Sequence, residues 1–270
     1  MNFKDVVIYS DADNTFLKTW GENVEASAPQ NNLDAIKYFM DKGGHFSIAT
    51  GREHSSIERF FNYKLNLPIV QSNGVLIYDT INNKVIKADY LEKDIKKEII
   101  DLCLNKKNYY LCCGVDDAIY QIDFNDERDN SLHDVVRKHV SIDYCLNNNV
   151  CKLCFVVKEN EMEELKREVN QLKCKKKINS VQSSKIYLEC FTVNANKGNG
   201  IKAALELTGL IDKTLVCIGD YYNDLPMLNI ADIKACPDNS PQDIKDICDI
   251  VVCNNNEGAI ADLIYKLEKM

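Results

Sequence analysis

The feature that most constrains this sequence is a short apolar segment near its start that runs directly into two aspartates. Val6–Tyr9 is an unbroken apolar run, which is typical of a strand buried on both faces of a parallel sheet. Asp11, Asp13 and Asn14 follow it. Two like unit charges about 4 Å apart repel by roughly 4 kcal/mol at an effective dielectric constant of about 20. A bound Mg²⁺, which prefers oxygen ligands, would offset that repulsion. The alternative is an ordinary strand-end turn, where Asp and Asn are also favoured.

The alternation of strand and helix patterns predicts two domains. After the first strand come a helix containing Ile36 and Phe39, a strand Phe46–Ala49, a helix with Ile57, Phe60 and Phe61, and a strand Pro68–Gln71. This alternation with short links is typical of a parallel sheet with right-handed crossovers. This alternation of strand and helix patterns stops after residue 78 and resumes after residue 187. We therefore expect an α/β fold, with a Rossmann-like parallel-sheet core formed by residues 1–78 and 188–270. We expect residues 79–187 to be an inserted α+β cap domain.

The patterns inside each later segment support this division. In the insert, strands are predicted at Tyr109–Cys113, Ile119–Phe124, Val150–Val157 and Lys185–Phe191, and helices at Ile95–Cys103 and Met162–Leu172. In the last segment, a helix is predicted from Asn196 to Gly209, a strand at Leu215–Ile218, then two further helix–strand pairs and a helix after Glu257.

Polar residues gather where these core strands and helices meet one edge of the sheet. They are Thr50 with Gly51, Lys197, and Asp220 with Asn223 and Asp224. The carboxyl ends of parallel strands share an edge, and ligands bind there. Each residue also has a plainer interpretation. Thr50 would serve as a helix cap, Lys197 as a surface lysine and Asp220 as part of a turn.

Taken together, these residues fit phosphoryl transfer through a covalent aspartyl intermediate. A carboxylate with an ordinary pKa of about 3.9 is ionised at neutral pH, so Asp11 can attack phosphorus directly. Mg²⁺ held by Asp11 and Asp220 would cancel the repulsion from the phosphate. Asp13 would protonate the leaving group and then accept a proton from water. Thr50, Gly51 and Lys197 would stabilise the phosphate oxygens.

These motifs resemble those of the haloacid dehalogenase superfamily of phosphatases, in particular the Cof-like group with a large α/β cap. The matching segments are Asp11-x-Asp13-x-Thr15, Ala49-Thr50-Gly51-Arg52, Asn196-Lys197-Gly198 and Gly219-Asp220-x-x-Asn223-Asp224. The resemblance implies Asp11 as the nucleophile, Asp13 as the acid–base and, through its backbone carbonyl, a metal ligand. It also implies Asp220 as a Mg²⁺ ligand, Asn223 as a phosphate contact and Asp224 as support for the metal site. Asn14 replaces the usual glycine, and Asn tolerates positive φ.

Composition limits the partners. The net charge of −8 argues against nucleic acid or an anionic membrane as the main partner. No apolar run approaches the roughly 18 residues of a membrane span. The opening residues lead straight into a strand and leave no room for a signal peptide, so a cytoplasmic protein is expected. The twelve cysteines are then expected to be reduced. Cys151 and Cys154 have metal or redox spacing, but they lie in a strand pattern without a second such pair.

The sequence therefore predicts a Mg²⁺-dependent phosphatase that acts on a small phosphorylated metabolite, such as a sugar phosphate, a nucleotide or a cofactor phosphate. A phosphomutase of the same superfamily is one alternative, and a non-catalytic phosphoacceptor or ligand-binding regulator is another. Asp13 favours hydrolysis, because a bare acceptor gains nothing from a proton donor. The cap would select the substrate. Tyr109, Tyr110, Tyr120 and Arg128 are candidates to line the cleft, with core or surface roles as the alternative.

Overall fold

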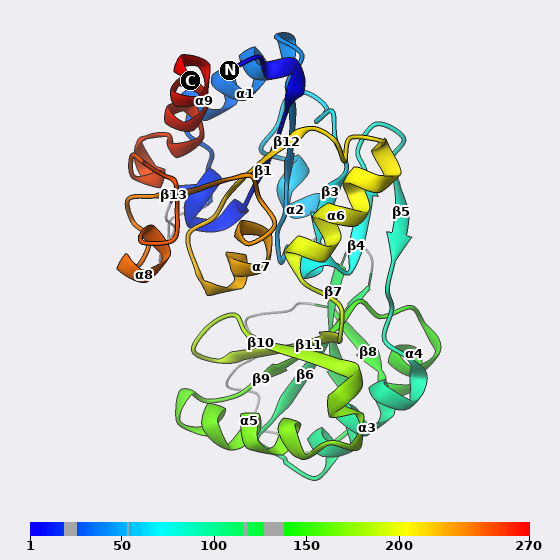
Figure 1. Ribbon diagram of the computed structural model, residues 1–270. Helices are drawn as coiled ribbons and strands as arrows, with labels where there is room; N and C mark the ends of the chain where they lie inside the picture. Colours follow the sequence, from blue (N-terminus) through cyan, green and yellow to red (C-terminus); the bar gives the residue numbers. More distant parts are fainter. Residues whose placement is uncertain (19–25, 53, 116–117, 127–137) are drawn as a thin grey trace. The chain divides into compact units, whose positions relative to one another are not determined.

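The computed structural model of the protein describes residues 1–18, 26–52, 54–115, 118–126 and 138–270. They form two compact units, one made of Met1–Lys87 with Asn196–Met270 and the other of Ala88–Ala195 (Figure 1). The expected boundaries after residues 78 and 187 fall instead inside β4 (Leu76–Asp79) and β11 (Tyr187–Thr192). Strand pairing explains the difference, because a whole strand stays with the sheet that satisfies its backbone groups.

The central sheet of the first unit is parallel, with strand order β14-β13-β12-β1-β2. The bounds are Val6–Ser10 for β1, His45–Ile48 for β2, Thr214–Ile218 for β12, Ile233–Pro237 for β13 and Ile250–Val252 for β14. Every residue of β1 is buried, in agreement with its apolar run. The chain passes from β1 to β2 on one side and later occupies the other side with β12. Ligands of such sheets bind at this change of direction. The predicted α/β core is confirmed.

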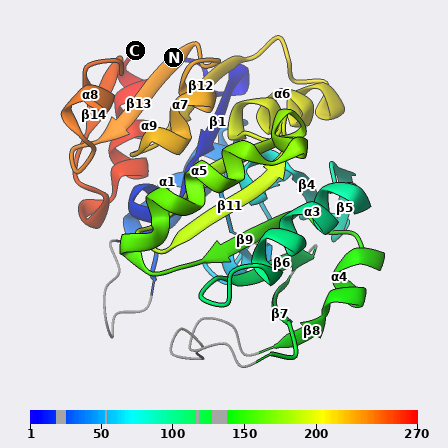
Figure 2. The ribbon, with the colours of Figure 1, turned by 90° about the horizontal axis from the view of Figure 1, so that it is seen from below.

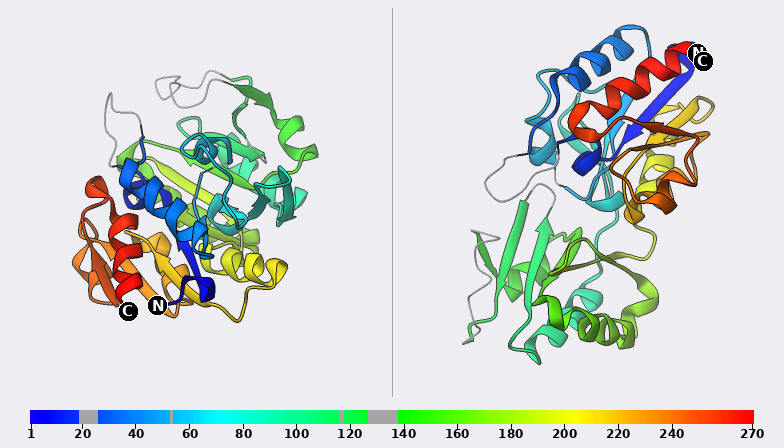
Figure 3. Two further views of the ribbon diagram at one scale, coloured as in Figure 1. Left: turned by 90° about the horizontal axis from the view of Figure 1, so that it is seen from above. Right: turned by 90° about the vertical axis from the view of Figure 1, so that its left-hand side faces the viewer.

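Helices cover both faces of this sheet. They are α1 (Gln30–Asp41), α6 (Lys197–Thr208), α7 (Leu225–Leu228), α8 (Gln242–Lys245) and α9 (Ala259–Lys269). α1 and α9 lie side by side (Figure 3, blue and red) and pack with Val6 and Ile8 of β1. α6, α7 and α8 pack with Val7 and Tyr9 on the other face. Successive side chains of a strand point to opposite faces, so a strand covered on both sides must be apolar throughout.

The predicted parallel order continues to β3 (Ile69–Gln71) and ends there. β3 meets the end of β2 through a parallel bridge between Ala49 and Val70, and the chain then returns antiparallel as β4. β5 (Lys84–Ala88) completes a three-stranded sheet. The reversal passes through Ser72–Gly74, whose φ angles of 47°, 52° and 99° are all positive. The prediction missed β4 and β5, because this turn of Ser, Asn and Gly was interpreted only as a strand end.

The helix predicted around Ile57 is shorter than expected. α2 spans only His54–Glu58, so Phe60 and Phe61 lie beyond its end. The Phe61 ring stacks on Phe16 instead, with centroids 5.0 Å apart and planes 4° from parallel. A helix of little more than one turn has a small dipole. The phosphate contacts predicted for Thr50 and Gly51, which precede α2, would therefore come from a loop and not from a helix terminus.

The second unit is an α+β domain, as predicted for the insert. Its sheet has the order β10-β11-β9-β6-β7-β8, antiparallel except between β7 and β8. Besides β11, its strands are β6 (Tyr110–Val115), β7 (Ala118–Asp123), β8 (His139–Ser141), β9 (Lys152–Val156) and β10 (Ile178–Gln182). Its helices are α3 (Lys93–Leu104), α4 (Ile142–Asn147) and α5 (Met162–Gln171). Figure 2 shows α3 and α5 over the strands, and their apolar residues share one core with Leu153 and Phe155 of β9.

No disulfide joins the cysteines, which all lie in the described residues, and most of them are buried. Cys151 immediately precedes β9 and Cys154 lies within it, as the strand interpretation predicted.

Tyr109 has a core role, since it is buried and its hydroxyl donates a hydrogen bond to Glu168 at 2.9 Å. Tyr110 is buried in a second apolar cluster of this unit, and the Tyr120 ring lies 5.9 Å from that of Tyr144. Arg128 lies outside the described residues.

None of the helices in the described ranges has the length and apolar character needed to cross a membrane.

Candidate active site

The structure places Asp11 immediately after β1, at the carboxyl edge of the parallel sheet. The Asp11 N–H donates to the Ile218 carbonyl at 2.9 Å and so continues the pairing with β12. The Ser10 hydroxyl donates to the Asp11 carbonyl at 2.6 Å. Asp11 is 6% exposed. Its backbone is thus held by two neighbours while its carboxylate faces the other acidic residues of this edge.

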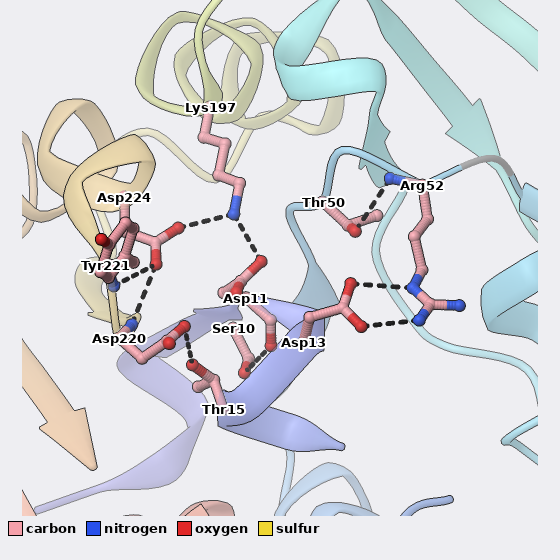
Figure 4. A network of polar contacts seen from close by, with 10 residues as sticks. All are labelled: Ser10, Asp11, Asp13, Thr15, Thr50, Arg52, Lys197, Asp220, Tyr221 and Asp224. Atoms are coloured by element: carbon pink, nitrogen blue, oxygen red, sulfur yellow. Dashed lines mark hydrogen bonds and ion pairs between the residues drawn. The ribbon is translucent and has the colours of Figure 1, made fainter. Parts of the chain in front are cut away.

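Three buried carboxylates and one lysine form the centre of the site, drawn in Figure 4. One oxygen each of Asp11, Asp220 and Asp224 lies within 4.8 Å of the others. The Lys197 ammonium donates to Asp11 and, at 2.6 Å, to Asp224. The structure therefore brings together residues from three distant parts of the chain, as the strand-end argument predicted. The surface interpretation of Lys197 is wrong, because its side chain is fully buried.

Close packing of α6 explains how a lysine reaches this position. Lys197 is the first residue of α6, and the Asn196 side chain caps the helix by accepting a hydrogen bond from the Asn199 N–H at 2.9 Å. A side chain at Gly198 would lie 2.3 Å from the Pro226 carbonyl, and one at Gly200 would lie 2.4 Å from Val70. Only glycine permits these approaches. The glycines thus bring the start of α6 against α7 and β3.

The ionisable groups of the cluster perturb one another strongly. Burial, and then the Asp224 charge, raise the pKa of Asp11 well above its ordinary value. The same causes raise the pKa of Asp220 to about 6. Burial alone would lower the pKa of Lys197, but the carboxylates of Asp11 and Asp224 outweigh burial and raise it. When all three carboxylates are ionised, they exceed the single ammonium by two negative charges in a buried space, a balance that one divalent cation would neutralise.

The two acidic residues of the β12 loop have different surroundings. Both carboxylate oxygens of Asp224 accept hydrogen bonds. One accepts from the Lys197 ammonium, and the other accepts from the N–H groups of Asp220 and Tyr221 at 2.9 and 3.1 Å. Asp220 accepts a hydrogen bond from the Thr15 hydroxyl at 3.1 Å. Asp11 and Asp220 therefore fit a magnesium ion as direct oxygen ligands, whereas Asp224 shapes the loop and balances Lys197.

Thr50 and Gly51 occupy the next strand end. The Ala49 N–H donates to Ser10 at 2.8 Å, which places Thr50 beside the end of β1. Thr50 is buried, and its hydroxyl oxygen accepts the Arg52 N–H at 3.1 Å. A side chain at Gly51 would lie 3.3 Å from the amide nitrogen of Asn73, so Asn73 borders this loop as well. Asn223 lies half-buried in the turn that ends at Asp224.

Asp13 is directed away from the acidic cluster and toward Arg52 (Figure 4). The Arg52 Nε and Nη2 atoms donate to its two carboxylate oxygens at 2.8 and 2.6 Å. Asn14 has the positive φ, 56°, that was expected to keep the loop geometry, and its carbonyl accepts a hydrogen bond from Asn239 at 2.9 Å. The Arg52 contact was not predicted. The only signal for it in the sequence was its place in the Ala49–Arg52 motif.

The fold is α/β, and the site gathers buried carboxylates and a lysine at the edge of a parallel sheet. A profile of the haloacid dehalogenase-like hydrolases matches residues 8–264. The chain therefore belongs to this family of hydrolases, as the sequence motifs indicated.

Relatives and solved structures agree with this assignment. A Bacillus subtilis protein, 5-amino-6-(5-phospho-D-ribitylamino)uracil phosphatase YwtE, is 25% identical over 95% of this chain and 96% of its own. The structure of TM0651 from Thermotoga maritima superimposes with a TM-score of 0.80 at 22% identity, covering 96% of each chain. The subclass IIB sugar phosphatase BT4131 has a TM-score of 0.75 at 19% identity, covering 98% of this chain and 99% of its own. These likenesses confirm the predicted fold.

Proposed function

We propose that the protein is a Mg²⁺-dependent phosphatase that hydrolyses a small phosphorylated metabolite through an aspartyl-phosphate on Asp11. The observation that carries this proposal is the buried contact of Lys197 with Asp11, with Asp220 in the same cluster. A lysine in this position would hold the nucleophile in place and offset its repulsion from an incoming phosphate.

The proposed reaction consists of two successive displacements at phosphorus. In the first, an Asp11 oxygen forms a bond to phosphorus, the bond from phosphorus to the ester oxygen breaks, and Asp13 donates a proton to the departing oxygen. In the second, Asp13 takes a proton from a water molecule, whose oxygen bonds to phosphorus and releases Asp11. Lys197, Thr50, Gly51 and Asn223 would hold the phosphate oxygens. A magnesium ion held by Asp11, Asp220 and the Asp13 carbonyl would supply positive charge at the transferred phosphoryl group.

The named relatives support a phosphate ester of a sugar or sugar alcohol as the substrate class. YwtE and YitU of Bacillus subtilis are both named as phosphatases of a phosphoribityl compound, and BT4131 is named as a sugar phosphatase. The test is release of inorganic phosphate from a panel of sugar phosphates, sugar-alcohol phosphates, nucleotides and cofactor phosphates. Transfer of phosphate within a sugar without its release would instead identify a phosphomutase.

Removal of the metal is expected to abolish turnover. EDTA should stop phosphate release, and added Mg²⁺ should restore it, because Asp11 and Asp220 otherwise repel the phosphate dianion. Mg²⁺ should also raise the thermal unfolding midpoint of the free protein, since an ion that binds only the folded state stabilises it. Activity that is unaffected by EDTA would contradict the metal role.

Asp13→Asn is expected to slow turnover by roughly 10²–10⁴-fold, the usual contribution of general acid–base catalysis. The amide keeps the size of the side chain but cannot donate or accept the proton in question. Asp126→Asn, another change of charge on an exposed side chain, is the matched control and should leave the rate unchanged. An unaltered rate in Asp13→Asn would assign the acid to another group.

A further inference from the structure

Arg52 contacts the proposed acid–base residue, yet the proposed reaction leaves it without a role. Its guanidinium donates two parallel hydrogen bonds to Asp13, from Nε to Oδ2 at 2.8 Å and from Nη2 to Oδ1 at 2.6 Å. Figure 4 shows the two groups facing each other edge to edge. A pair of this bidentate kind fixes the orientation of the carboxylate in addition to supplying charge.

The position of Arg52 ties this contact to the phosphate loop. Its N–H donates to the Thr50 hydroxyl oxygen at 3.1 Å, and its carbonyl accepts from the Ser72 N–H at 3.4 Å. The same loop would therefore hold the phosphate through Thr50 and aim the carboxylate of Asp13. The exposed fractions of the Arg52 and Asp13 side chains are 22% and 33%. A leaving group can thus reach the carboxylate, and a pair this exposed adds little to stability.

The Asp13 side chain lies outside the acidic cluster and faces Arg52. Asp13 has extended backbone angles, φ −77° and ψ 132°, and is followed by the left-handed Asn14. Its carboxylate does not belong to the cluster formed by Asp11, Asp220 and Asp224. Rotation about its side-chain bonds would move the oxygens between staggered positions. The planar guanidinium of Arg52 favours one of these positions of the Asp13 carboxylate. A lysine ammonium, which acts as a point charge, would fix the carboxylate less well.

We propose that Arg52 is a positioning residue that acts through Asp13 and holds its carboxylate in line with the leaving-group oxygen of the substrate. This inference rests on the proposed function, in which Asp13 transfers protons. It predicts that the importance of Arg52 depends on how much the leaving group needs a proton.

The test is the kcat and KM of Arg52→Ala with two substrates. One is an alkyl phosphate from the panel, whose alkoxide requires protonation, and the other is p-nitrophenyl phosphate, whose weakly basic leaving group does not. With the alkyl ester we expect kcat/KM, which reports the steps up to transfer of the phosphoryl group to Asp11, to fall by about 10²-fold, the effect of a small misplacement of a reacting group. With p-nitrophenyl phosphate the fall in kcat/KM should be much smaller, although kcat can fall with both esters because Asp13 also activates the water of the second displacement. Arg52→Lys should recover only part of the alkyl-ester rate.

A double-mutant cycle shows whether Arg52 acts through Asp13. In the Asp13→Asn background, Arg52→Ala should have little further effect on the alkyl-ester rate, since residues that act as one unit are not additive. Added guanidinium ion should raise the rate of Arg52→Ala and leave that of the double variant unchanged. Arg59→Gln is the matched control, because Arg59 is exposed and lies over the Phe60 ring. It should behave as wild type with both esters.

The outcomes separate this inference from the proposed function. Equal losses of kcat/KM with both esters, or additive losses in the cycle, would overturn the positioning role while leaving the phosphatase proposal intact. An Asp13→Asn change without effect would assign the acid to another group and would also overturn the positioning role alone. A wild-type protein that hydrolyses neither ester would refute the proposed function and this inference with it. Thermal unfolding of each variant establishes that it is folded. If Arg52→Ala does not fold, the same comparison with Arg52→Gln decides between these outcomes.

Discussion

Asp11→Asn is expected to give a folded protein that no longer turns over. The amide has the shape of the carboxylate but is not a nucleophile toward phosphorus, so the rate should fall by on the order of 10⁴–10⁶-fold, as when other covalent nucleophiles are removed. The fold should survive, because the change removes one of the buried like charges of the cluster and Lys197 keeps its hydrogen bond to Asp224. Phosphate release and thermal unfolding measure the two effects separately.

The control and a second measurement make this prediction specific. Asp34→Asn, an exposed aspartate on α1, should retain full activity. After an acid quench during turnover, wild type should yield a phosphorylated peptide that contains residue 11, and Asp11→Asn should not. Substantial turnover by Asp11→Asn, or a phosphorylated peptide from elsewhere in the chain, would assign the nucleophile to a different residue.

Lys197→Met should reduce both activity and stability. Methionine fills a similar volume, but the ammonium that Asp11 and Asp224 share is lost, and the buried carboxylates then have no internal counter-charge. Removal of one partner from a buried ion pair costs about 3–5 kcal/mol of the free energy of unfolding. Loss of a preorganised donor to the phosphate should lower kcat by about 10²–10³-fold. Chemical denaturation and steady-state kinetics give these two values.

The metal supplies an internal check on this charge argument. Mg²⁺ should stabilise Lys197→Met more than it stabilises wild type, because the variant site has a larger excess of negative charge. Lys202→Met on the exposed face of the same helix should change neither stability nor rate. If Lys197→Met were as stable as wild type, Lys197 would not be the counter-charge of the cluster.

Local patterns predicted much of the core because they report burial directly. The apolar run Val6–Tyr9 is a strand covered on both faces, and Gly209, with φ 69°, ends α6 as predicted. The patterns failed where a tertiary contact replaced a local preference. Phe60 and Phe61 suggested a longer helix, but Phe61 instead packs on Phe16. The turn at Ser72–Gly74 follows the predicted strand β3 and starts a hairpin whose returning strand, β4, was not predicted.

The candidate site was predictable to the extent that it lies at strand ends. Asp11 and Asp220 follow neighbouring parallel strands, so their proximity follows from the topology alone. The burial of Lys197 does not follow from the topology, because it depends on Gly198 and Gly200, which let α6 approach its neighbours. The role of Asp224 as the partner of Lys197 likewise required the folded loop.

By itself the sequence determined which elements form and which chemical groups stand at their ends, because periodicity and turn residues act over a few positions along the chain. Only the tertiary structure decided which of those groups meet. Lys197 lies between Asp11 and Asp224, and Arg52 holds Asp13, because charged side chains from distant segments find partners only where packing brings their backbones within reach.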